Sequence, residues 1–236
     1  MKEGEGLIIE IKEYGNSSQI IKILTEEGKI AGFLKGNKKE KIAPFCLIKF
    51  KISKRLEEHL GSLKLEIVKT YYSLVLKQKI KIIVLCSLQE ILTFLVEESN
   101  PNKELYTQVI DFLNFLLSEE NINSIVIYYL KFELFILSNL GFGLDFTQCA
   151  LTGKKEIFFI SPLTGKCASF EVAKKFENKL FHIPFIYGNK NITNITFKED
   201  CGNAFKINSH FLQNIPNFKK LHSRERMICY ILNTNC

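Results

Sequence analysis

Residues 7–35 read LIIEIKEYGNSSQIIKILTEEGKIAGFLK and contain three short apolar segments separated by turns. Segments 7–12, 19–24 and 29–35 alternate apolar and polar residues with a period of two, which is typical of half-buried β-strands. The turn signals are Tyr14-Gly15-Asn16-Ser17, Glu26-Glu27-Gly28-Lys29 and Lys35-Gly36-Asn37. The stretch therefore predicts three consecutive strands.

Two further alternating segments follow, CLIKFKIS at 46–53 and SLKLEIV at 62–68. Five strands within about sixty residues predict a small barrel, and the OB-fold is the commonest five-stranded barrel that binds oligonucleotides. In the fourth segment, Ile48, Phe50 and Ile52 share one face, whereas Lys49, Lys51 and Ser53 share the other. We therefore expect a row of lysines on the outside of the barrel.

The period of the apolar residues changes at Gln78, where helical spacing begins. Three helices are predicted: one through Ile82, Leu85, Leu88, Leu92 and Leu95; one through Leu105, Val109, Phe112 and Leu116; and one through Tyr128, Phe132, Phe135 and Leu140. Asn100 is the expected N-cap of the second, Asn123 or Ser124 opens the third, and Gly141 and Gly143 end it. These helices are expected to form a bundle with an aromatic core, and Ser223 is expected to cap a last short helix.

Residues 137–169, LSNLGFGLDFTQCALTGKKEIFFISPLTGKCAS, resemble a helix end that runs into a metal-binding knuckle. Only Cys149 and Cys167 are present to hold a metal, whereas a closed structural zinc site requires four nitrogen or sulfur ligands. We expect the shape of a zinc ribbon without the zinc.

Charge is distributed unevenly along the 236 residues, whose formal net charge is +7. The net charge is +6 over residues 1–80, −5 over 81–160 and +6 over 161–236. Basic ends suit a polyanionic partner such as nucleic acid, although an ordinary mildly basic surface is the alternative. The N-terminus lacks the features of a secretory signal, and charges interrupt the longest apolar stretches, so no membrane association and a cytoplasmic location are expected. The seven scattered cysteines, without a CxxC pair, are expected to be reduced.

No arrangement of residues indicates catalysis. The Gly-Lys pairs at 28, 153 and 165 lack the preceding glycine of a phosphate loop, and the histidines at 59, 182, 210 and 222 form no metal-binding pair. Cys149 has no neighbouring sequence that signals an activated nucleophile. We expect a protein that is not an enzyme.

Together these features resemble the RecO family of bacterial recombination mediators, over roughly residues 6–169. The resemblance is carried by EYGNSSQIIKILTEEGKIAGFLKG at 13–36, Pro44-Phe45, KFELFILSNLGFGLDFTQCALTG at 131–153, SPLTGKCAS at 161–169 and HSRERM at 222–227. Family members with a full knuckle hold zinc through two CxxC pairs, whereas Thr152 stands three residues after Cys149 here. The absence of those cysteines weakens the expectation of a metal and not the resemblance.

The resemblance implies an α+β protein in four parts. These are an OB-fold DNA-binding domain at 1–76, a helical domain at 77–146, a zinc-ribbon-like insert lacking metal at 147–190, and a C-terminal helical segment at 191–236 that packs on the middle domain. It also implies binding to single- and double-stranded DNA, annealing of complementary strands, and, with RecR, loading of RecA onto SSB-coated DNA. A cytoplasmic location associated with the nucleoid follows from that role.

Eight basic residues are the predicted DNA-binding set: Lys35, Lys38, Lys39, Lys41, Lys49, Lys51, Lys54 and Arg55. Lysine acts as a flexible point charge, which suits contacts to phosphate and not the reading of base edges. Tyr14, Phe33 and Phe45 are candidates for stacking on bases, with Phe33 and Phe45 favoured as core residues.

Three further residues are candidates for partner contacts. The resemblance places Lys131 in the site that binds the acidic, apolar C-terminal tail of SSB, with an ordinary exposed lysine as the alternative. Arg224 and Arg226 are secondary candidates for DNA or partner binding.

Two other functions stay open at this point. An RNA-binding OB module with a helical interaction domain would use the same lysines but prefer RNA through its 2′-hydroxyl groups. A thiol or metal hydrolase would contain bound metal and would lose activity on Cys149→Ala.

Overall fold

The computed structural model describes residues 1–15, 17–36, 42–54, 60–98, 100–174, 176–188 and 195–234. The chain folds into two compact units, residues 1–118 with 221–227, and residues 119–220 with 228–236. Each unit is considered separately.

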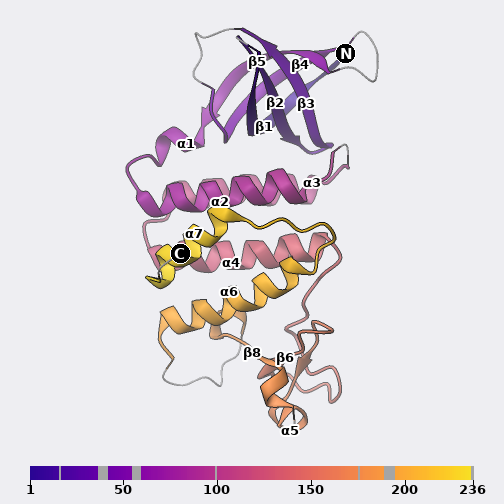
Figure 1. Ribbon diagram of the computed structural model, residues 1–236, viewed down its shortest axis with the longest axis vertical. Coiled ribbons are helices and arrows are strands. Elements are labelled where there is room, and N and C mark those ends of the chain that lie inside the picture. The colour runs from indigo at the N-terminus through magenta and orange to yellow at the C-terminus, as the bar shows by residue number, and fades with distance from the viewer. Residues whose placement is uncertain are drawn as a thin grey trace. The chain divides into compact units, whose positions relative to one another are not determined.

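The first unit begins with a closed five-stranded barrel (Figure 1). Its strands are β1 (Lys2–Tyr14), β2 (Ser18–Thr25), β3 (Gly28–Lys35), β4 (Cys46–Ser53) and β5 (Gly61–Thr70). They follow one another around the barrel in the order β1-β2-β3-β5-β4, and every pairing is antiparallel except the short parallel contact between β3 and β5. The predicted five-stranded OB-type barrel in an α+β chain is confirmed.

Apolar side chains from all strands fill the barrel, as the alternation in 46–53 predicted. Ile48, Phe50 and Ile52 are at most 5% exposed, and Lys49 and Lys51 between them are exposed. Burying such side chains contributes about 1.5–3 kcal/mol each. The alternation of β4 therefore fixes which of its faces looks into the core.

The barrel closes where β3 meets β5, and glycine is required there. An added Cβ on Gly61 would lie 2.4 Å from Cγ2 of Ile52, and one on Gly32 would lie 2.9 Å from Cβ of Leu63. Gly32 thus lets β3 lie close to β5, and Gly61 lets β5 lie close to Ile52 of β4.

A β-bulge interrupts β1 at Ile9. Ile8 pairs with Ile23 and Glu10 pairs with Lys22, so Ile9 is an extra residue between two pairs. Without the bulge, Glu10 would share the inward face of Ile8; with it, the Glu10 side chain lies on the outside.

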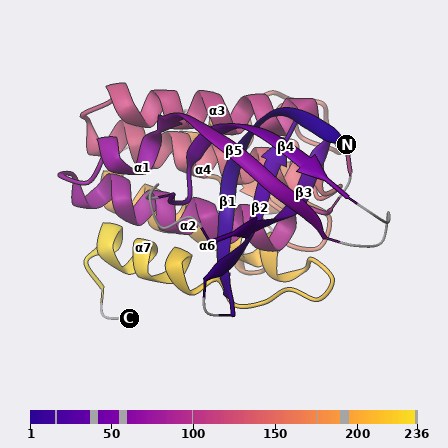
Figure 2. The same cartoon turned by 90° about the horizontal axis from the view of Figure 1, so that it is seen from above.

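Two long helices lie across one end of the barrel, α2 (Lys79–Leu95) and α3 (Lys103–Ser118), after the single turn α1 (Tyr71–Leu74) (Figures 1 and 2). The predicted cap of the second helix is wrong: Asn102, and not Asn100, accepts a hydrogen bond from the backbone N–H of Leu105 at 2.8 Å. The backbone of Asn100 instead packs against Gly28 in the turn between β2 and β3.

The last helix, α7 (His222–Leu232), begins on α2. The Glu90 carboxylate accepts hydrogen bonds from the backbone N–H groups of His222 at 2.8 Å, Ser223 at 2.7 Å and Arg224 at 3.2 Å. The expectation that Ser223 caps this helix is therefore wrong, because a distant carboxylate satisfies the free N–H groups and favours the positive end of the helix dipole.

The second unit is built on α4 (Ile122–Asn139) and α6 (Phe197–Gln213), which pack together. Between them lie β6 (Phe159–Ile160), β7 (Cys167–Ala168), α5 (Phe170–Ala173), η1 (Glu177–Lys179), β8 (Phe181–His182) and η2 (Phe185–Tyr187). The three short strands form a sheet in the order β7-β6-β8. Asn121 caps α4 by accepting hydrogen bonds from the N–H groups of Asn123 and Ser124.

The buried stripe of α4 differs from the predicted one. Tyr129 and Phe132 are buried, whereas Tyr128 and Phe135 are half-buried. The α4 and α6 helices are joined by a buried polar contact, because the Asn208 amide donates to the Glu133 carboxylate at 3.0 Å and to the Leu130 carbonyl at 3.2 Å. Glu133 thus lies within the buried, mostly apolar face of α4, where Asn208 of α6 satisfies its carboxylate.

The division into 1–76, 77–146, 147–190 and 191–236 stays a prediction, although α6 of the last segment packs on α4.

Of the cysteines described, Cys229 is disulfide-bonded, so the expectation of reduced thiols throughout is wrong for that residue. Within the described parts of the chain, no helix is both long and apolar enough to cross a membrane.

Candidate nucleic-acid interface

The predicted DNA-binding lysines are spread over different parts of the barrel. Lys35 ends β3, Lys49 and Lys51 lie on β4, and Lys54 directly follows it; all four are exposed. Lys38, Lys39, Lys41 and Arg55 lie outside the described residues.

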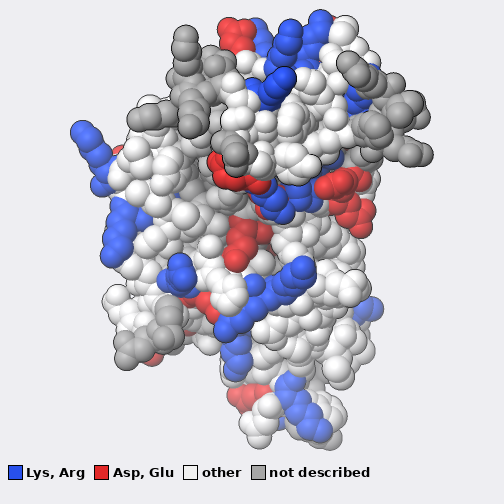
Figure 3. All heavy atoms as spheres, turned by 45° about the horizontal axis from the view of Figure 1, so that its top comes forward, with Lys and Arg blue, Asp and Glu red and all other residues white. Residues whose placement is uncertain are grey.

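The lysine row on β4 is flanked by carboxylates. Lys49 pairs across the sheet with Glu5 on β1 and with Glu66 on β5. Lys51 pairs with Glu3, whose Oε2 lies 3.4 Å from Lys51 Nζ. Both basic and acidic residues lie on the part of the barrel that is seen in Figure 3. This face carries mixed charge, and exposed ion pairs of this kind leave little net field for a polyanion.

Lys35 belongs to the other outer face, made by β1, β2 and β3. The strand register arranges nine outward side chains in three rows: Glu10, Lys22 and Ala31; Lys12, Ile20 and Phe33; Tyr14, Ser18 and Lys35. We call this set the β1–β3 face. In OB-folds the surface of strands 2 and 3 is the one that binds oligonucleotides and oligosaccharides.

Two aromatic rings lie on the β1–β3 face. Tyr14 is 58% exposed and meets the half-buried Phe33 edge to face, with ring centroids 5.7 Å apart. Phe45 is 1% exposed and is a core residue, as favoured from the sequence, whereas Phe33 lies on the outside. An exposed ring held by a second ring is suited to stacking on a base.

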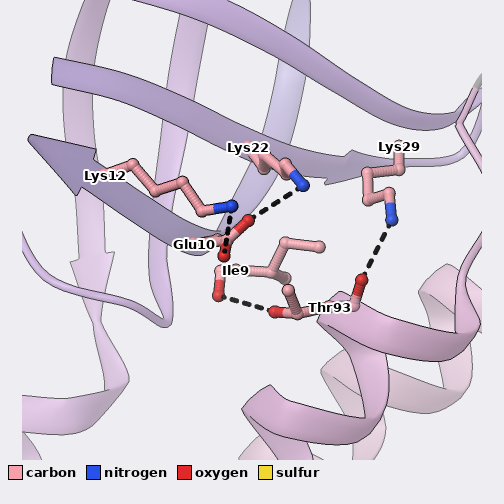
Figure 4. Close-up of polar contacts among 6 residues, drawn as sticks. All are labelled: Ile9, Glu10, Lys12, Lys22, Lys29 and Thr93. Carbon is pink, nitrogen blue, oxygen red and sulfur yellow. Dashed lines mark hydrogen bonds and ion pairs between the residues drawn. The ribbon is translucent and has the colours of Figure 1, made fainter. Parts of the chain in front are cut away.

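Charged side chains cluster around Glu10 and Lys22, in the row of the β1–β3 face that is nearest α2 (Figure 4). The Glu10 carboxylate lies between two amino groups, with Oε2 2.9 Å from Lys22 Nζ and Oε1 3.3 Å from Lys12 Nζ. Burial raises the pKa of Glu10, but hydrogen bonds and charge attraction from the two lysines outweigh it and lower the pKa below its usual range. Glu10 is therefore ionised at neutral pH.

Lys29 lies beside this cluster and points toward α2 (Figure 4). Its side chain is buried, and Nζ donates to the carbonyl oxygen of Thr93 on α2 at 3.1 Å (Figure 4). Burial lowers the pKa of Lys29, and the nearby charge of Lys22 acts in the same direction. Lys29 thus links the barrel to α2 and does not contribute to the open surface.

Backbone hydrogen bonds form the turns of the expected knuckle around Cys149 and Cys167, in the second unit. The N–H of Gly153 donates to the Cys149 carbonyl at 2.9 Å, and the N–H of Ala150 donates to the Cys167 carbonyl at 2.9 Å. Burial raises the pKa of Cys149, but hydrogen bonds from the Thr152 side chain and three backbone N–H groups lower it to about 6. Burial, followed by nearby negative charge, raises the pKa of Cys167 to about 12.

One thiolate beside one neutral thiol does not supply a closed zinc site. Throughout the described residues, no group of three or more His, Cys, Asp or Glu side chains is placed to hold a metal ion. The donors present at the knuckle therefore do not fit a structural zinc.

The remaining predicted residues belong to helices and not to the barrel. Lys131 is exposed on α4 and directly precedes the buried Phe132. Arg224 is only 5% exposed in the first turn of α7, which leaves little of its surface for DNA, and Arg226 is exposed. Their binding roles stay predictions.

Sequence reasoning did not select Glu10, Lys12 or Lys22. The alternation around the first turn places Lys12, Tyr14 and Ile20 on one face, which was a usable signal. The same alternation places Glu10 with Lys12 and Tyr14, because the bulge at Ile9 lies before all three.

The barrel order and the β1–β3 face define the class: an OB-type barrel protein with a helical region after the barrel. Comparison with known families agrees. The family model described as recombination protein O N terminal matches residues 1–71, and that described as recombination protein O C terminal matches residues 77–214.

Individual relatives carry the name DNA repair protein RecO. That of Wolbachia pipientis wMel is 33% identical over 215 residues, covering 88% of this chain and 89% of the relative. Those of Ruegeria sp. (strain TM1040) and Bartonella quintana (strain Toulouse) are 30% identical over 186 residues and 29% identical over 218 residues, covering 76% and 88% of this chain and 76% and 86% of the relatives. The chain belongs to the recombination protein O family, RecO.

Proposed function

We propose that this protein acts in DNA repair and recombination by binding single- and double-stranded DNA through its barrel and annealing complementary strands. With RecR it would help to load RecA onto SSB-coated DNA. The β1–β3 face carries this proposal, because it combines the exposed Tyr14, packed on the half-buried Phe33, with lysines on the strands that OB-folds use for oligonucleotides.

The arrangement suits binding without sequence preference. Lys12 and Lys35 flank the Tyr14–Phe33 pair, so phosphates and bases can be contacted together. Stacking tolerates every base, and lysine contacts phosphate as a point charge. A protein that handles any damaged strand requires such tolerance.

Annealing requires no catalytic group. Two strands repel each other through their phosphates, and lysines that neutralise phosphate lower this repulsion. We therefore propose a binding protein that is not an enzyme and that needs no zinc for this activity.

Partner binding is proposed for the residues beyond the barrel. We propose that Lys131, exposed on α4 one turn before the half-buried Phe135, meets a carboxylate that adjoins an apolar side chain, as in the C-terminal tail of SSB. Arg226 is a second candidate for contact with DNA or a partner. We propose action in the cytoplasm, at the nucleoid.

Annealing of labelled complementary oligonucleotides, bare and SSB-coated, tests the proposal. Lys12→Ala/Lys35→Ala should slow annealing and reduce the salt dependence of binding, by a slope of about 0.7 per lost phosphate contact for single strands. Tyr14→Ala should weaken single-strand binding roughly 5- to 150-fold, from about 1–3 kcal/mol per stacked base, and Tyr14→Phe should restore it.

Lys174→Ala/Lys198→Ala is the matched control, because it removes two exposed lysines from the second unit. Competition between DNA and RNA strands of the same sequence separates DNA binding from RNA binding. Failure of the wild type to anneal or bind DNA, or preference for the RNA competitor, would remove the proposal.

A further inference from the structure

We propose that Glu10 limits the affinity of the β1–β3 face for single-stranded DNA, by holding the place of a backbone phosphate between Lys12 and Lys22. The inference rests on the proposed DNA binding of this face. It identifies a residue that sets the strength of binding.

The geometry of the cluster carries the inference. Each carboxylate oxygen of Glu10 meets a different ammonium group, at 2.9 Å for Lys22 and 3.3 Å for Lys12 (Figure 4). A phosphodiester also presents two anionic oxygens, so the same pair of lysines can bridge it. The two lysines are held by the carboxylate in positions that suit a phosphate.

This carboxylate lies on the outer surface because β1 is irregular just before it. The bulge at Ile9 turns Glu10 outward, next to Lys22, and leaves Ile9 buried. The Ile9 carbonyl accepts a hydrogen bond from the Thr93 hydroxyl of α2 at 3.5 Å (Figure 4). The acidic side chain is therefore fixed by the packing of β1 on α2.

The charged cluster adjoins the aromatic pair of the β1–β3 face, so Glu10 can affect the binding of DNA there. Lys12 is shared, because it pairs with Glu10 and also lies in the same row as Phe33. The side chains of Glu10 and Lys22 are 17% and 21% exposed, and that of Lys12 is 59% exposed. A strand lying over Tyr14 and Phe33 thus reaches Lys12 first and competes with Glu10 for it.

A mediator must release DNA as well as bind it, and a carboxylate that competes with phosphate weakens the bound state. Replacing Glu10 by glutamine keeps the size of the side chain and removes its charge. Both lysines then become available to phosphate, and each new contact releases counterions from the strand.

The test is fluorescence anisotropy of a labelled oligothymidylate titrated with full-length wild type, Glu10→Gln and Glu13→Gln across a series of salt concentrations. Glu13 is the matched control, because its exposed side chain lies on the other face of β1 and accepts from Gln19 Nε2 at 2.7 Å. Circular dichroism melting checks that each variant is folded.

Glu10→Gln should bind roughly 4- to 15-fold more tightly near 0.15 M salt, and the slope of log affinity against log salt should steepen by about 0.7 to 1.4, for one or two added phosphate contacts. Glu13→Gln should change both quantities little. In the background of Lys12→Ala/Lys22→Ala, the gain from Glu10→Gln should disappear.

Three results would overturn the inference. Equal gains in the two glutamine variants would assign the effect to net charge, and unchanged or weaker binding by folded Glu10→Gln would show that the carboxylate does not compete with phosphate. If Glu10→Gln still increases the affinity for DNA in the Lys12→Ala/Lys22→Ala background, the two lysines do not mediate the gain. If the wild type and all variants fail to bind, the proposed function itself fails.

Discussion

Single residues of the β1–β3 face determine its chemistry. Tyr14 offers a ring, Lys12 and Lys35 offer charge, and Glu10 offsets part of that charge. The predicted lysines on β4 are equally exposed, yet each has a carboxylate partner across the sheet. The count of lysines in a sequence therefore says less about DNA binding than the identity of the side chains opposite them.

The ion pairs of Glu10 predict a dependence of stability on pH. The folded protein lowers the pKa of Glu10 below its ordinary value of 4.5, so the unfolded state binds more protons in the range between the two values. The stabilisation is fully present above the unfolded pKa and is lost as the pH falls through the folded pKa.

Wild type should accordingly have a higher free energy of unfolding than Glu10→Gln near pH 7, and the difference should shrink below about pH 4.5. Urea unfolding of both proteins at several pH values measures it. A difference that grows on acidification would contradict the assignment of the ion pairs.

At the scale of elements, the barrel depends on strand contacts that glycine permits. The seam between β3 and β5 has only two paired positions, Gly32 with Gly61 and Phe33 with Ser62. A side chain at Gly61 would overlap Ile52, whereas at Gly4 an added Cβ would be 3.5 Å from the ring of Phe50, which is an ordinary contact.

Gly61→Ala should therefore destabilise the protein by about 1–3 kcal/mol, the usual cost of an overpacked core, and Gly4→Ala in the same barrel should cost less. Chemical denaturation of the two variants measures the difference. Equal stability of the two variants would show that β5 moves away without loss and that closure does not depend on this glycine.

At the scale of the whole molecule, residues far apart in sequence satisfy one another's hydrogen-bonding groups. Glu90 on α2 caps α7 from a position 132 residues earlier in the chain than His222. The C-terminal helix thus begins with N–H groups that are satisfied only after α2 has formed.

Glu90→Ala should destabilise the start of α7 by about 0.5–2 kcal/mol, the usual cost of losing an N-cap. Hydrogen exchange at the amides of His222, Ser223 and Arg224 should speed up. The start of α6 is the internal control, because Thr196 and Glu199 cap it locally. Equal protection of the α7 amides in the variant would contradict the role of Glu90.

Several features were determined by the sequence alone because their causes are local. Alternation in β1 to β5 placed all five strands, and helical spacing found α2, α3 and α4. The order of local motifs was sufficient for the resemblance to RecO. The row of lysines on β4 was also found, since a strand exposes every second residue.

Tertiary structure decided the features that depend on long-range contacts. The bulge at Ile9, packed on α2, lets Ile8 face the core while Glu10 lies on the outside opposite Lys22. Glu90, and not Ser223, caps α7, and Asn208 of α6 satisfies Glu133 within the buried face of α4. The physical reason is common to all three: a buried or terminal polar group is satisfied by whichever partner folding brings near, and sequence distance does not limit that choice.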